Sequence, residues 1–100
     1  MAKEYITKDE VEQYLDDYGF NRRLKGYRYF VDMIMSADRN PEMNCKQLCE
    51  YLVDTKYTHL SVSTIYRGCN YSIAVNPDCF ETTWDVINGA ISNKTADRRR

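Results

Sequence analysis

The chain has 100 residues, a formal net charge of −1 and 29% charged residues, which is the size of one domain with its own hydrophobic core. No stretch approaches the ~20 apolar residues of a membrane span, and no apolar run follows a charged start as in a secretory signal. We therefore expect a cytoplasmic protein without membrane contact, whose four cysteines stay reduced. Residues 1–97 are expected to form a single domain, followed by a basic tail at 98–100.

The charges are divided unevenly along the chain. Residues 1–20 are mainly acidic, whereas residues 21–40 are mainly basic. The first segment predicts an acidic, solvated surface, and the second predicts a surface that faces phosphates. The near-neutral total argues against a strong non-specific nucleic-acid binder, although a local basic patch is what docking on DNA requires.

The hydrophobic pattern predicts an all-α fold, a compact bundle of about five helices. Thr7 and Glu10 form a capping box before the first helix, which Gly19 ends. A second, broad and central helix is expected from about residue 23–25 to residue 37. Gly26 inside it costs about 1 kcal/mol relative to alanine, which indicates a close backbone approach or a helix entry. The expected apolar stripe of this helix is Leu24, Tyr27, Phe30, Val31, Ile34 and Met35.

The third and fourth helices are expected to form a helix-turn-helix. Asn44 can cap the third helix, and Ser61 or Ser63 can cap the fourth, which lies within 60–75. The helical period breaks between them, so the order is helix, short polar turn, helix. The fifth helix is expected to start at Pro77 and to end at Gly89. Its expected buried side is Phe80, Trp84, Ile87 and Ile91.

The segment 60–75 predicts a helix with two opposed faces, because residues in a helix turn by about 100° each. The apolar face gathers Val62, Ile65, Tyr66, Cys69 and Ile73, and the outer face gathers Thr64, Arg67, Asn70 and Tyr71. The outer face has one charge, whereas surface helices usually carry several. Because Arg and Asn fit the major-groove edges of guanine and adenine, one hypothesis is a DNA recognition helix. The alternative is an ordinary amphipathic helix.

Individual side chains can be assigned to DNA contacts on this hypothesis. The expected base contacts are Arg67, Asn70, Thr64 and Tyr71, and the expected phosphate contacts are Ser63, Lys56, His59, Arg22, Arg23 and Lys25. For each of them the alternative is an ordinary surface role as an ion pair, a helix cap or a solvated charge.

No catalytic residue, cofactor or metal is predicted. His59 has no nucleophile or carboxylate at a catalytic spacing, and the chain has no glycine-rich phosphate loop, so we expect no enzyme. Cys45, Cys49, Cys69 and Cys79 with His59 could supply zinc ligands. Zinc is disfavoured because no tight Cys-x-x-Cys pair exists and three of these cysteines fit apolar stripes.

Residues 24–34, with the sequence LKGYRYFVDMI, resemble the signature helix of a known family. That family is the DNA-binding effector domain of the master response regulator that initiates sporulation in endospore-forming bacteria. The small polar run before Ile65, followed by Arg67 and Ile73, is similar to its recognition helix. The segment from Asn88 onward looks like the part after its fifth helix, and the resemblance covers roughly residues 10–97. It implies an all-helical output domain that binds promoter DNA through the second helix of a helix-turn-helix.

The expected function is therefore sequence-specific transcription regulation. The partner is double-stranded DNA at promoter or operator sites, and a homodimer and RNA polymerase or another protein are further candidates. The alternative is a protein–protein interaction module that keeps this fold but has lost DNA binding. Tyr66, Asn70 and Tyr71 stand where the family's helix usually carries charge, which favours the alternative. The basic second segment and the Arg/Asn face favour DNA.

Overall fold

The computed structural model describes residues 5–75 and 80–98, with side chains as far as residue 92. Over these residues the chain forms five helices and no strand. They are α1 (Lys8–Asp17), α2 (Lys25–Arg39), α3 (Cys45–Thr55), α4 (Val62–Ala74) and α5 (Thr83–Arg98). The predicted all-α fold with five helices is confirmed. None of these described helices is long and apolar enough to cross a bilayer.

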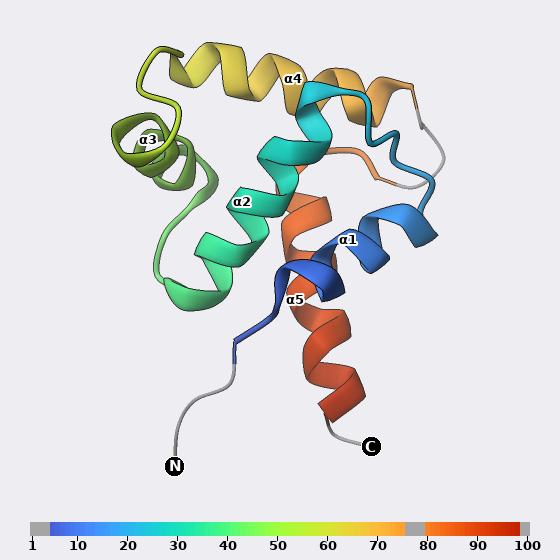
Figure 1. Ribbon diagram of the computed structural model, residues 1–100. Coiled ribbons are helices and arrows are strands. Elements are labelled where there is room, and N and C mark those ends of the chain that lie inside the picture. Colours follow the sequence, from blue (N-terminus) through green and yellow to red (C-terminus); the bar gives the residue numbers. More distant parts are fainter. Residues whose placement is uncertain (1–4, 76–79, 99–100) are drawn as a thin grey trace.

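Helix α2 is the central element and contacts each of the other four helices. Figure 1 shows it running through the middle of the molecule, with α4 across its N-terminal end. Phe30, Met33 and Ile34 of α2 have no solvent exposure. Tyr29 and Met33 are buried in addition to the predicted stripe, because neighbours pack against α2 from more than one side.

The ends of α1 follow the predicted local signals. The Glu10 N–H donates to the Thr7 hydroxyl, and the Thr7 N–H donates to the Glu10 carboxylate, so the capping box is confirmed. After the helix, Gly19 has a φ of 82°, a backbone conformation that side chains disfavour. The chain turns there towards α2.

Side-chain caps also begin α3 and α4. Asn44 caps α3 as predicted, and Gln47 completes a capping box with it. Ser61 caps α4 by accepting a hydrogen bond from the Thr64 N–H. Of the two candidate serines, Ser61 is therefore the cap, and Ser63 lies in the first turn of the helix.

Helices α2 and α4 approach each other closely at two glycines. A Cβ atom on Gly26 would overlap the Gly68 carbonyl oxygen and the Ser72 hydroxyl. The predicted close backbone approach at Gly26 is therefore confirmed. Because Gly68 and Ser72 belong to α4, the approach is a crossing between α2 and α4. Ser72 is buried there, and its hydroxyl has no hydrogen-bond partner within the described part of the chain.

The fifth helix differs from its prediction at both ends. It begins at Thr83 instead of Pro77, which lies outside the described residues, and it continues past Gly89 to Arg98. A Cβ atom on Gly89 would overlap the Tyr14 hydroxyl. This glycine therefore permits close packing between α1 and α5 and does not end a helix.

The buried side of α5 also differs from its prediction. Trp84 was expected in the core, but 36% of it is exposed. The side chains that face the core are Thr83, Val86, Ile87 and Ala90. Phe80 precedes the helix and packs its ring against Tyr18 and Phe20, with centroids 4.9 and 5.9 Å apart. Of the predicted set, Ile87 is fully buried, and Phe80 and Ile91 pack against the core, so the prediction is wrong only for Trp84.

Candidate nucleic-acid interface

Helices α3 and α4 contact each other and are joined by residues 56–61. This is the order on which the helix-turn-helix prediction rests. Helix α4 lies along one edge of the molecule (Figure 1). Ile65, Cys69 and Ile73 are buried, whereas Arg67 and Tyr71 are exposed. The predicted helix with two opposed faces is therefore present, and one face is open to solvent.

Two hollows adjoin at the N-terminal end of α2. One lies between this end and the segment 56–61, with a volume of about 310 Å³. The other lies between the same end and α4, with a volume of about 400 Å³. Arg23, Leu24, Lys25 and Tyr29 line both hollows, so we treat them together as the basic groove.

The side chains that line the basic groove give it a positive charge. They include Arg22, Arg23, Lys25, Arg28, His59 and Arg67, and no Asp or Glu of the described residues is among them. Arg23, Lys25, Arg28 and Arg67 form no ion pair with any other described residue. Leu24 at the N-cap of α2 supplies no side-chain acceptor, so the positive end of this helix is uncapped.

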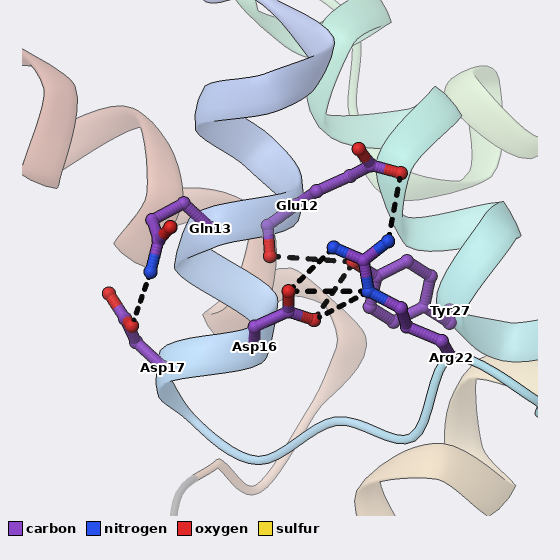
Figure 2. Close-up of polar contacts among 6 residues, drawn as sticks. All are labelled: Glu12, Gln13, Asp16, Asp17, Arg22 and Tyr27. Carbon is purple, nitrogen blue, oxygen red and sulfur yellow. Dashed lines mark hydrogen bonds and ion pairs between the residues drawn. The ribbon is translucent and has the colours of Figure 1, made fainter.

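Arg22 is the exception, because its guanidinium is already bound within the protein. Figure 2 shows it between two carboxylates of α1. Its Nη2 lies 2.6 Å from Asp16 Oδ2, and its Nη1 lies 3.8 Å from Glu12 Oε2. The Tyr27 hydroxyl also donates to Asp16, at 3.1 Å. Arg22 therefore ties the segment before α2 to α1, and we leave it out of the proposed phosphate contacts.

The Arg22–Asp16 pair predicts a pH-dependent contribution to stability. The hydrogen bond from Arg22 holds the pKa of Asp16 below its ordinary value. A carboxyl with a lowered pKa in the folded state stabilises that state above its unfolded pKa, and this stabilisation is lost as the pH falls through the folded pKa. We expect Asp16→Asn to unfold at lower urea concentration than the wild type at pH 7, with the difference shrinking by about pH 3.

A matched control exists one residue along the same helix. Asp17 accepts a hydrogen bond of 2.7 Å from the neutral Gln13 amide, so Asp17→Asn removes the same charge without removing an ion pair. We expect a smaller change from this variant. If the Asp16→Asn effect were equal at both pH values, the pair would not be its cause.

Lys56 is also bound within the protein. Its Nζ lies 3.0 Å from Asp32 Oδ1, and the Tyr57 hydroxyl donates to the other carboxylate oxygen. The Asp32 side chain is 15% exposed, and these two partners replace part of the water that its carboxylate loses. Lys56 therefore fastens the segment 56–61 to α2, and we leave it out of the proposed phosphate contacts.

The structure separates the predicted base contacts into two groups. Thr64, Arg67 and Tyr71 line the basic groove. Asn70 does not, and its amide oxygen accepts a hydrogen bond of 3.4 Å from the Thr83 hydroxyl at the start of α5. Three residues along a helix correspond to a turn of about 60° around its axis, which carries Asn70 towards α5.

The remaining predicted phosphate contacts are all exposed. Arg23, Lys25 and His59 line the basic groove, whereas Ser63 lies on α4 outside it. Arg28 also lines the groove, although the sequence assigned it no individual contact. Arg28 lies three residues after Lys25, so the two side chains share one face of the helix, and this spacing could have predicted Arg28 as a groove residue.

The cysteines form no metal site with other described residues. Cys45, Cys49 and Cys69 are free thiols. No three His, Cys, Asp or Glu side chains of the described part of the chain are placed to hold a metal ion. Cys79, the fourth candidate ligand, lies outside the described residues.

Comparison with protein-family models, curated proteins and solved structures found no match to this chain. The resemblance to the sporulation effector domain therefore stays a prediction. A function has to be argued from the basic groove and the exposed face of α4.

Proposed function

We propose that this chain is a sequence-specific, DNA-binding transcription regulator, in which α3 and α4 act as a helix-turn-helix and α4 enters the major groove. The observation that carries the proposal is the charge of the basic groove. Arg23, Lys25, Arg28 and Arg67 have no ion-pair partner among the described residues, and no described acid lines the groove. Unpaired cations on one surface can neutralise phosphates and release counterions, which is the main source of affinity for DNA.

In this proposal the cations of the basic groove contact phosphates, and Arg67 of α4 contacts a base. Arg23 and Lys25 at the start of α2, with His59 before α4, are suited to phosphates. The uncapped N–H groups of α2 favour an anion at the same place. Arg67 lies in the middle of α4 and is suited to a bidentate pair with guanine, which contributes about 1–3 kcal/mol of discrimination. Thr64 and Tyr71 flank it on the groove side.

The second candidate is a protein–protein interaction module on the same surface. Two observations favour it: Tyr71 is 59% exposed, and Asn70 is hydrogen-bonded to α5. Tyrosine and arginine are both enriched in protein interfaces. A protein partner with an acidic surface would fit the same cations.

Selection from a pool of random DNA duplexes, repeated over a salt series, separates the two candidates. We expect one motif to be enriched, with a slope of about −3 in log K against log [salt], since Arg23, Lys25 and Arg28 neutralise about three phosphates. A motif with two-fold symmetry would indicate a homodimer. A salt slope without an enriched motif would contradict sequence-specific reading, and the absence of both would overturn DNA binding.

A further inference from the structure

Asp32 of α2 binds two consecutive residues of the segment that joins α3 to α4. Lys56 Nζ donates to Asp32 Oδ1 at 3.0 Å, and the Tyr57 hydroxyl donates to Oδ2. The Asp32 carboxylate is mostly buried and the Tyr57 side chain is buried, so the bond between them is shielded from solvent. Burial, and then the hydrogen bond to Asp32, raise the pKa of the Tyr57 phenol, which therefore remains a donor at neutral pH.

The position of Tyr57 determines how the segment enters α4. Its ring packs edge-on against Tyr29 of α2, with centroids 5.2 Å apart. Its carbonyl accepts a hydrogen bond of 2.9 Å from the Leu60 N–H, and Ser61 then caps α4. Tyr57, His59 and Leu60 also line the basic groove. A shift of Tyr57 would therefore move one wall of the groove and the start of α4 together.

The Asp32 bonds add a second point of attachment between α2 and the part of the chain that carries Arg67. The first point is the crossing of α2 and α4 at Gly26 and Gly68. Contact at one point would leave two rigid helices free to pivot about it. Asp32 lies about 9 Å further along α2, at a rise of about 1.5 Å per residue. Its bonds to the segment before α4 therefore restrict the angle between the two helices.

We infer, on the basis of the proposed DNA-binding function, that Asp32 is a positioning residue for sequence reading. It holds the α3–α4 segment so that the groove cations reach phosphates while Arg67 reaches a base. Non-specific binding needs only the cations, because phosphates carry no sequence information. Base reading also needs Arg67 in register with the phosphate contacts. The Asp32 carboxylate therefore raises specificity, although its charge repels DNA.

The test compares Asp32→Asn with Asp54→Asn by titration of two labelled duplexes, one with the enriched motif and one with a scrambled sequence. Asp54 is exposed on α3, and its carboxylate has no hydrogen bond or ion pair with other described residues. We expect Asp32→Asn to lower the ratio of the two affinities by about tenfold, which is the discrimination of one bidentate arginine–guanine pair. Its affinity for the scrambled duplex is expected to stay the same or to rise. Asp54→Asn is expected to keep the ratio.

The same titrations separate the failure of this inference from that of the proposed function. A parent chain without an enriched motif would overturn the proposed function and, with it, the role of Asp32. A parent chain that reads a motif, with a ratio that Asp32→Asn leaves unchanged or that both variants lower equally, would overturn the role of Asp32 alone.

The Lys56→Gln/Tyr57→Phe variant tests whether Asp32 acts through its two partners. Phenylalanine keeps a ring against Tyr29 and removes only the hydroxyl. This variant is expected to lower the ratio as Asp32→Asn does, and adding Asp32→Asn to it is expected to cause no further loss. A further loss would mean that Asp32 acts by another route, against the inference.

Amide hydrogen exchange distinguishes positioning from a general loss of stability. Asp32→Asn is expected to speed exchange of the Leu60 N–H, which donates to Tyr57, more than exchange of the α1 amides. Equal acceleration at both places would mean that the variant only lowers overall stability, and the positioning role would be wrong.

Discussion

Gly26→Ala is expected to lower the free energy of unfolding by about 2 kcal/mol. Alanine normally stabilises a helix interior by about 1 kcal/mol relative to glycine, so the expected effect has the opposite sign to helix propensity. The added methyl group would overlap the Gly68 carbonyl oxygen and the Ser72 hydroxyl at the crossing of α2 and α4. The carbonyl belongs to the backbone of a packed helix, so relief requires α4 to move. Urea titration monitored by circular dichroism measures the change.

Ser72→Ala provides the matched control for this crossing. The Ser72 hydroxyl is buried and has no hydrogen-bond partner among the described residues, so its removal is expected to be neutral or stabilising. In the double variant it is expected to recover part of the loss caused by Gly26→Ala, because one of the two overlaps disappears. A Gly26→Ala chain as stable as the wild type would contradict the close approach of α2 to α4.

Replacing Arg23, Lys25 and Arg28 together by glutamine is expected to reduce the salt slope of DNA binding by about 3. These side chains have no ion-pair partner among the described residues, so their replacement removes the proposed phosphate contacts without breaking an ion pair inside the protein. Affinity is expected to fall on all sequences alike. Titration of labelled duplexes at several salt concentrations measures both quantities.

The control for this variant removes the same charge elsewhere. Lys8, Arg39 and Lys46 are exposed and do not line the basic groove, so their triple glutamine variant is expected to keep most of the slope. Equal losses in both variants would mean that overall charge, and not the groove, controls binding.

Arg67→Ala is expected to act differently from the loss of the three groove cations. It should reduce the free energy of discrimination by about 1–3 kcal/mol at one base pair, because Arg67 is the proposed base contact on α4. The preference for one base at that position is then relaxed. Binding to a set of single-base variants of the enriched motif measures this. A uniform loss across the set would place Arg67 among the phosphate contacts.

Features that depend on a few neighbouring residues could be predicted from the sequence. The capping box of Thr7 and Glu10, the cap at Asn44 and the turn at Gly19 are all present. Each depends on residues within four positions of one another, so no knowledge of the fold was needed. The two faces of α4 follow in the same way from the helical period.

Two predictions for the fifth helix were wrong, its end at Gly89 and the burial of Trp84. Glycine often ends a helix, but Gly89 lies within α5, where Tyr14 of α1 packs against it. Trp84 is apolar and was expected in the core, yet 36% of it is exposed, whereas its neighbour Thr83 is buried. The contact between Gly89 and Tyr14 depends on a helix far away in the sequence.

The same division applies to the candidate site. The basic segment and the outer face of the fourth helix could be recognised from residue types and the helical period alone, because both are properties of one continuous stretch. The sequence alone could not show which cations lack an ion-pair partner. Arg22 pairs with Asp16 on the preceding helix, and Lys56 pairs with Asp32, which is 24 residues away. Because ion pairs depend on which charges the fold brings together, only the tertiary structure could show that Arg23, Lys25, Arg28 and Arg67 have no ion pair among the described residues.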